Sequence, residues 1–209
     1  MNNQTDVQAA TADDAAAMLA CLVDDLDEGF AALVRSQQRV VYSVALRMTR
    51  SPPEAEDLTA ETFLRAYRAL LGYDRSRVLA LRPRSWLLTI TLNTWRNSVR
   101  DASRRPSQVS VADLPDSRAG DQDVEQAVES AESQRELGRL IAQLPWAQRV
   151  AVVLRHVVEL PMAEVAAVLE CPEGTAKSHV SRGLRKLRTL YGAVPLPGER
   201  AVVGRRELR

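Results

Sequence analysis

Apolar side chains recur at every third or fourth position along most of this chain, a spacing that gathers them on one face of an α-helix. Leu33, Val41, Val44 and Met48 show this spacing clearly within residues 26–48. We find no run that alternates apolar and polar residues, as a half-buried β-strand would. The sequence therefore predicts an all-α fold.

Breaks in this pattern divide the chain into helices. Ser51 and Glu54 have the spacing of a capping box ahead of the second helix, and Thr175 is placed to cap the last helix. Residues 72–84 are predicted to be a loop that holds one short apolar turn. The helices are expected over about 26–50, 53–70, 85–104, 124–143, 145–159, 161–169 and 175–191.

The charges change sign at the same places. Residues 30–105 carry 14 basic and six acidic side chains and residues 137–209 carry 12 basic and six acidic ones, while the segments before and between them are acidic. Two basic blocks separated by an acidic spacer suggest two modules that each meet a polyanion. We therefore expect an acidic disordered tail at 1–24, a three-helix bundle at 25–105, a flexible acidic linker at 106–123, a four-helix domain at 124–191 and a disordered tail at 192–209.

Several classes of protein are excluded by the composition. The longest apolar run, residues 15–23, is too short to span a bilayer and lacks the basic flank of a signal peptide. Cys21 and Cys171 match no disulfide framework or zinc spacing, which suits a reducing interior such as the cytoplasm. Since no Gly-rich phosphate loop or nucleophile–base arrangement is present, we expect no enzyme activity, no cofactor and no metal site.

The C-terminal module has the proportions of a helix-turn-helix: a nine-residue helix, a turn at Gly174 and a longer final helix. On that final helix Val180, Leu184, Leu187 and Leu190 are predicted to face inward, and the opposite face is basic with no acidic interruption. An α-helix fits the major groove of DNA, where Lys and Arg donate to base edges and phosphates. A solvated basic face is the alternative, but the preceding helix and the glycine turn favour DNA binding.

The helix at 53–70 carries an acidic face inside an otherwise basic module. Glu56, Asp57 and Glu61 lie near one face at spacings of four and five residues, which suggests a cationic protein partner. On spacing alone, a solvated face with a Glu61–Arg65 pair is an equal alternative.

The helix at 85–104 combines amides, arginines and Trp95 beside a loop. This combination suits single-stranded or melted nucleic acid, whose bases stack on aromatic rings or enter pockets. Trp86, at the start of the helix, is expected to belong to the core, because large aromatic side chains dominate core burial.

Three segments carry a resemblance to a known family. They read AEDLTAETFLRAY at 55–67, SWLLTITLNTWRN at 85–97 and LPWAQRVAVVLRHVVELPMAEVAAVLECPEGTAKSHVSRGLRKLR at 144–188. In this order and spacing they closely resemble bacterial RNA polymerase sigma factors of the sigma-70 family, and the compact form resembles the extracytoplasmic-function (ECF) group, group IV. The resemblance covers about 30–105 as sigma region 2 and 124–191 as sigma region 4, which contains the helix-turn-helix.

This resemblance implies a function, partners and site residues. It implies that the chain binds core RNA polymerase at the β′ clamp and β flap, recognises the minus-thirty-five and minus-ten promoter elements and promotes DNA melting to initiate transcription. It also implies an anti-sigma factor as a partner, and no membrane insertion. The residues that match by position are Glu56, Asp57, Leu58 and Glu61 for core polymerase; Asn93, Arg96, Asn97 and Arg100 for the minus-ten element, with Asn93 holding a flipped base; and Thr175, Lys177, Ser178, Ser181, Arg182 and Arg185 for the minus-thirty-five element.

A helix-turn-helix transcriptional regulator is the alternative function. Such a protein would bind duplex DNA by itself without being a polymerase subunit. Its weakness is that the first two motifs would then be coincidental.

Overall fold

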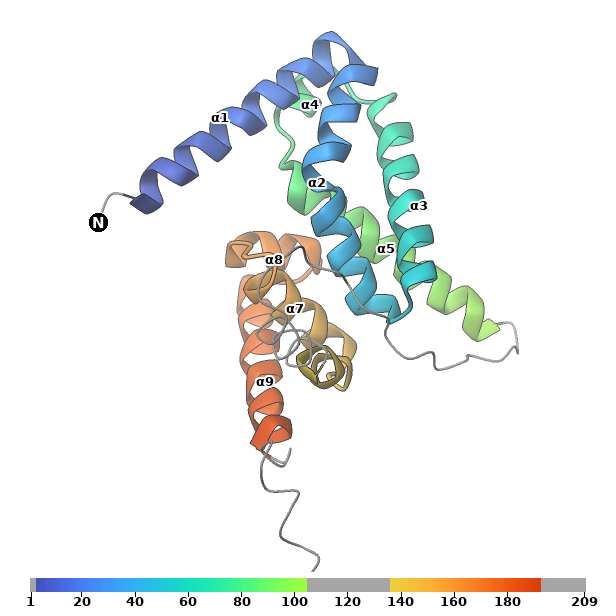
Figure 1. Ribbon diagram of the computed structural model, residues 1–209, viewed down its shortest axis with the longest axis vertical. Helices are drawn as coiled ribbons and strands as arrows, with labels where there is room; N and C mark the ends of the chain where they lie inside the picture. Colours follow the sequence, from blue (N-terminus) through green and yellow to red (C-terminus); the bar gives the residue numbers. More distant parts are fainter. Residues whose placement is uncertain (1–2, 105–135, 193–209) are drawn as a thin grey trace, which may run out of the picture.

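The computed structural model describes residues 3–104 and 136–192, and the side chains of 14–101 and 136–192. All regular elements in those ranges are helices, which confirms the all-α prediction for the part of the chain described (Figure 1). The helices are α1 (Asn3–Asp24), α2 (Leu26–Thr49), α3 (Pro52–Leu70), α4 (Arg75–Leu79), α5 (Pro83–Arg104), α7 (Trp146–His156), α8 (Met162–Val168) and α9 (Glu173–Gly192), and residues 136–142 are also helical.

Helices α2, α3 and α5 pack against one another and form the predicted three-helix bundle (Figure 1). The short helix α4, at the predicted apolar turn, joins α3 to α5. Helix α3 shows how its sequence dictates this packing, because every side chain on the inward side of its helical period is buried. These side chains are Ala55, Leu58, Thr62, Phe63, Ala66 and Leu70.

Helix α1 extends the bundle beyond the expected boundary. Leu19 and Leu22 are 7% and 4% exposed, and they belong to the same apolar cluster as Val78 of α4. Gly29 permits this approach, since a Cβ atom there would lie 2.4 Å from the backbone nitrogen of Leu22. The expectation of a loose tail over 1–24 is therefore wrong for the described side chains: the acidic residues lie around an apolar face that packs onto the bundle.

Two predicted caps are also wrong. Ser51 occupies the cap position of α3, but its hydroxyl makes no capping hydrogen bond. Helix α9 begins at Glu173, two residues earlier than expected, so Thr175 lies inside the first turn and donates its backbone N–H to the Pro172 carbonyl at 2.9 Å.

Residues 136–142 and helices α7, α8 and α9 form the second domain. The inward face of α9 is built from Ala176, Val180 and Gly183, whereas Leu184 is 36% exposed. The predicted stripe is thus wrong at Leu184, because small residues allow α9 to lie close to α7. The predicted linker, the first part of the helix at 124–143 and the tail after Gly192 lie outside the described residues.

The two domains share one apolar core. Val44 and Met48 of α2 and Leu88 and Leu92 of α5 form a single buried cluster with residues of α7, α8 and α9. Figure 1 shows α7 and α8 set against the lower part of the bundle. In this arrangement the second domain covers one side of α5.

Candidate nucleic-acid interface

The six residues predicted to read duplex DNA lie on the N-terminal half and middle of α9. All six are exposed: Thr175, Lys177, Ser178, Ser181, Arg182 and Arg185. Lys177 pairs with Glu173 at 2.7 Å, and the Ser178 hydroxyl donates to the Gly174 carbonyl at 2.9 Å. Because α9 is the second helix of a helix-turn-helix, this face can enter a major groove.

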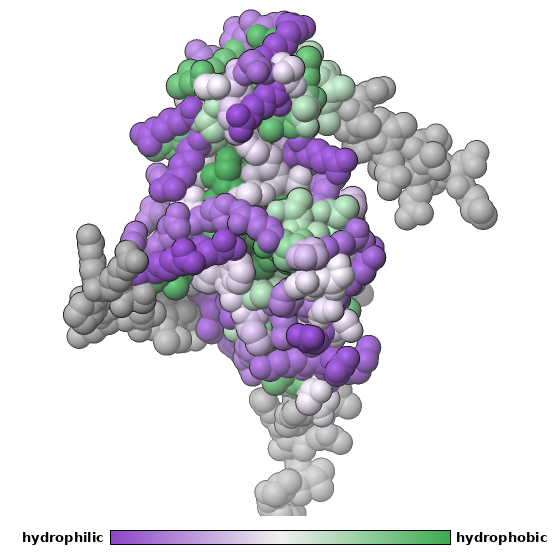
Figure 2. All heavy atoms as spheres, turned by 180° about the vertical axis from the view of Figure 1, so that it is seen from behind, coloured by the Kyte–Doolittle hydropathy of each residue, from purple (hydrophilic) through white to green (hydrophobic). Residues whose placement is uncertain are grey.

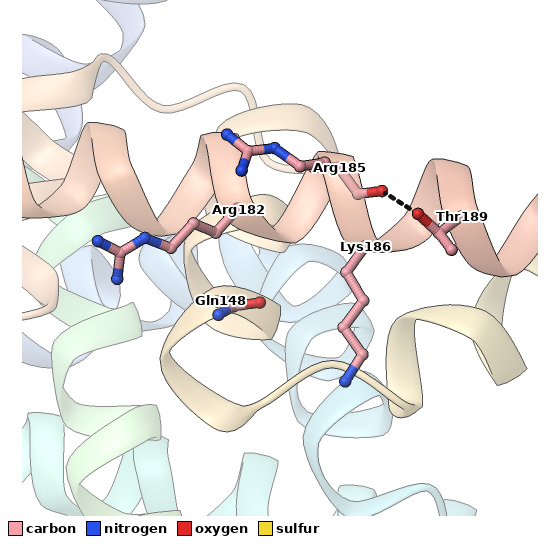
Figure 3. A pocket seen from close by; sticks show the side chains of 5 residues that line it. All are labelled: Gln148, Arg182, Arg185, Lys186 and Thr189. Atoms are coloured by element: carbon pink, nitrogen blue, oxygen red, sulfur yellow. Dashed lines mark hydrogen bonds between the residues drawn. The ribbon is translucent and has the colours of Figure 1, made fainter.

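A basic hollow continues this face toward α7. Its volume is about 390 Å³, and it is lined by Gln148, Arg182, Arg185, Lys186 and Thr189 (Figure 3). Among the described residues, no acidic side chain forms an ion pair with its three cations. Side chains of this kind can bind the phosphate backbone of a nucleic acid. Gln148, Lys186 and Thr189 of the hollow are not among the residues predicted to contact DNA. Figure 2 shows that hydrophilic side chains also dominate the lower part of the molecule seen from behind.

Gly183 fixes the distance between α7 and α9 at this hollow. A Cβ atom on Gly183 would lie 2.7 Å from Cγ2 of Val152 and 3.3 Å from the carbonyl oxygen of Gln148. The sequence pattern did not single out this glycine. A glycine in the interior of an amphipathic helix is the signal that could have revealed it.

The predicted minus-ten residues lie on α5, and the structure brings two of them together. Arg96 donates to the Asn93 side-chain oxygen at 3.3 Å, and both side chains are half-buried. Asn97 and Arg100 lie on the exposed end of the same helix. Trp95 lies between Asn93 and Arg96 in the sequence. It is partly buried and offers a flat aromatic ring.

The loop before α5 is held by local interactions. The Asp74 carboxylate accepts hydrogen bonds from the Ser76 hydroxyl at 2.6 Å and from the Arg77 backbone N–H at 2.8 Å, and these bonds lower the pKa of Asp74. The Arg77 guanidinium lies 3.8 Å from the centre of the Tyr73 ring. Trp86 packs against Tyr73 within an apolar cluster, in agreement with its predicted place in the core.

The acidic face of α3 is only partly as predicted. Glu56 and Asp57 are exposed, and Glu61 forms an ion pair with Arg65 at 2.6 Å. Leu58, however, is 7% exposed and packs against α2, so it supports the helix from inside and presents no contact surface. This burial corrects its assignment as a contact residue.

Sequence reasoning missed two exposed apolar side chains, one on the outer side of α3 and one at the residue that directly follows the helix. Leu64 and Leu71 are 45% and 64% exposed. They are seven residues apart, which places them on one face of the helix, away from the core stripe. That spacing could have identified them.

The residues that the structure describes contain no group of three or more potential metal ligands, and none of their helices is long and apolar enough to cross a membrane. Cys21 and Cys171 are free and half-buried. His156 is exposed.

The described residues form two helical modules, and the second carries a helix-turn-helix with an exposed basic face. The family models for Sigma-70 region 2 and Sigma-70, region 4 match residues 33–105 and 134–187. The chain is 32% identical over 156 residues to the ECF RNA polymerase sigma factor SigE of Mycolicibacterium smegmatis, a match that covers 75% of this chain and 59% of that protein. It is 30% identical over 160 residues to the RNA polymerase sigma-H factor of Pseudomonas aeruginosa, covering 73% of this chain and 81% of that protein.

Two solved structures share the fold. The sigma factor RpoE, solved with the anti-sigma factor NepR from Bartonella quintana, has a TM-score of 0.62 at 20% identity over 78% of this chain and 96% of that chain. CnrH, solved with the cytosolic domain of CnrY, has a TM-score of 0.62 at 21% identity over 87% and 99%. The chain belongs to the ECF group of bacterial RNA polymerase sigma factors, the class that directs transcription initiation, which confirms the family prediction.

Proposed function

We propose that this chain binds core RNA polymerase through the outer face of α3 and carries it to promoters. The observation that carries the proposal is the separation of two exposed charged surfaces on two domains of one chain: an acidic one on α3 and a basic one on α9. Glu56, Asp57 and Glu61 supply the charge for a basic site on the polymerase clamp, and Leu64 and Leu71 add apolar area. In a contact of this kind the charged side chains orient the partner and the apolar side chains bury surface.

In this proposal α9 reads the minus-thirty-five element as duplex DNA. Lys177, Ser181 and Arg182 face the base edges, while Arg185 and Lys186 at the hollow hold phosphates. Phosphate neutralisation makes the affinity strongly dependent on salt.

Helix α5 and the loop before it read the minus-ten element after melting. Asn93, supported by Arg96, holds a base that has left the stack, and Trp95 offers a ring for stacking.

The chain supplies no chemistry of its own, because the polymerase performs the polymerisation, and it acts in the cytoplasm, where that enzyme works. RpoE was solved with the anti-sigma factor NepR and CnrH with the cytosolic domain of CnrY, which supports an anti-sigma partner for this chain too.

Reconstitution with core polymerase tests the proposal. Run-off transcription from candidate promoters should require this chain and both promoter elements, and Glu61→Lys should lower the affinity for core polymerase. A chain that binds promoter duplex tightly by itself but supports no transcription from any promoter would instead be a helix-turn-helix regulator.

A further inference from the structure

The loop before α5 packs on α1. Its short helix α4 lies against α1 more extensively than against any other described helix (Figure 1). Val78 is the buried side chain of α4, 5% exposed, and it belongs to the same apolar cluster as Leu19 and Leu22. The Arg75 guanidinium also lies 3.6 Å from the Asp24 carboxylate, but both side chains are exposed. Because exposed ion pairs contribute little, the contact is mainly apolar.

Helix α4 depends on this contact. It has five residues, far fewer than the roughly 12–15 that an isolated helix needs in water. The Asp74 carboxylate caps it by accepting from the Arg77 backbone N–H at 2.8 Å, but a cap does not hold so short a helix by itself. The further stabilisation comes from the burial of Val78 against α1.

The corner between α1 and α2 gives α1 a fixed direction. Asp25 caps α2 by accepting from the backbone N–H groups of Asp27 and Glu28 at 3.0 and 3.1 Å. At Gly29 the backbones of the two helices are in close contact, since a Cβ atom there would also lie 2.5 Å from the α-carbon of Leu22. The end of α1 is therefore a firm support for α4.

The other side chains of α4 are open to solvent. They are Arg75, Ser76, Arg77 and Leu79. Such side chains can donate to phosphates and base edges or pack against an unstacked base. Where they lie depends on α4, and the place of α4 depends on α1.

Resting on the proposed function, we infer that Leu19 and Leu22 are positioning residues for the recognition of the minus-ten element. They hold Val78, and through it α4, where the loop reads the melted strand. Without this contact the strand would have to order the loop as it binds, and that cost lowers both affinity and discrimination. The inference gives α1 a part in promoter selectivity as well as in the core.

A promoter library randomised over the minus-ten element tests this inference. The full chain and core polymerase transcribe the library, and selectivity is the yield from the sequences that the wild-type chain prefers divided by the mean yield. A change in the folded fraction scales every yield equally and cancels in this ratio, whereas a displaced loop changes the ratio. A second library, randomised over the minus-thirty-five element, is the internal reference, because α9 reads that element in the proposed function.

The test variant is Leu19→Ala. Leu19→Met nearly conserves the side-chain volume and is the conservative variant. Val41→Ala is the matched control, because it also removes a buried side chain of the same cluster. Val41 lies in α2, about 18 Å along the helix from Gly29 and the corner with α1.

Hydrogen exchange gives a second measurement, which begins with the wild-type chain. The backbone N–H groups of Val78 and Ala80 each donate to a carbonyl oxygen at 3.1 Å, those of Asp74 and Ser76. We expect both amides to be protected in the wild-type chain and to exchange about tenfold faster or more in Leu19→Ala. Wild-type amides that exchange as fast as those of an unfolded peptide would overturn the inference even if Leu19→Ala did not fold.

We expect Leu19→Ala to lower the minus-ten selectivity about fivefold or more, since one base pair of a binding site contributes a factor of about 5 to 150. Leu19→Met and Val41→Ala should stay within about twofold of the wild-type chain, and the minus-thirty-five selectivity should not change in any variant. If Leu19→Ala loses no more minus-ten selectivity than Val41→Ala, the inference is overturned. If the wild-type chain with core polymerase transcribes neither library, the proposed function itself has failed.

Discussion

Replacing Gly183 by alanine should destabilise the second domain. The added Cβ atom would lie 2.7 Å from Cγ2 of Val152, a β-branched side chain that is 3% exposed and has little rotamer freedom. It would also lie 3.3 Å from the Gln148 carbonyl oxygen, which belongs to the backbone of α7 and cannot rotate away. Overpacking of this kind costs about 1–3 kcal/mol.

The helical context partly offsets that cost. Alanine in place of glycine inside a helix contributes about 1 kcal/mol. We therefore expect the free energy of unfolding to fall by up to about 2 kcal/mol for Gly183→Ala, measured by urea denaturation, with faster hydrogen exchange in α7 and α9.

The same helix offers a matched control. Gly174 also lies in α9, and a Cβ atom there would meet no atom within 4 Å. Gly174→Ala should leave the stability unchanged or raise it by up to about 1 kcal/mol. A Gly183→Ala chain as stable as the Gly174→Ala chain would refute the reasoning that close approach of α7 and α9 requires a glycine.

Three further predictions concern other parts of the molecule. Leu22→Ala should lower the free energy of unfolding by about 2–4 kcal/mol in a denaturation experiment, because it leaves a cavity under α1; no loss would mean that α1 does not dock. Asn93→Ala should slow promoter opening about tenfold in a stopped-flow melting assay while sparing closed-complex formation, since the residue acts on an unstacked base; an equal loss in both steps would argue against that role. Arg182→Ala should weaken binding of the preferred upstream duplex about five- to tenfold and relax selectivity there, as measured with promoter libraries; a change in downstream preference would contradict it.

Sequence reasoning succeeded where one amphipathic period determines the outcome. The inward side chains of α3 could be predicted because they repeat with helical spacing, and their burial follows from that repeat alone. The same reasoning predicted the exposed basic face of α9. Three motifs in a fixed order then identified the family.

Sequence reasoning failed where packing between helices determines which side chains are buried. Helix α1 was predicted to be a tail because its acidic composition outweighed the two apolar residues Leu19 and Leu22. These side chains are buried only because α1 packs against α2 and α4, and the sequence does not show that contact. The spacing predicted that Leu184 is buried, but its neighbour Gly183 packs against α7 and Leu184 is 36% exposed. The contact between Glu170 and Asn93 joins residues far apart in the sequence, so no local pattern could reveal it.

The two surfaces proposed to contact DNA differ in their exposure. Ser181 and Arg182 of α9 are exposed, whereas Asn93 and Arg96 of α5 are half-buried against the second domain. Helical spacing predicts which face of a helix is polar, but it does not predict which other helix lies against that face. Sequence reasoning therefore treated the two surfaces alike, although packing leaves only the one on α9 fully open to solvent.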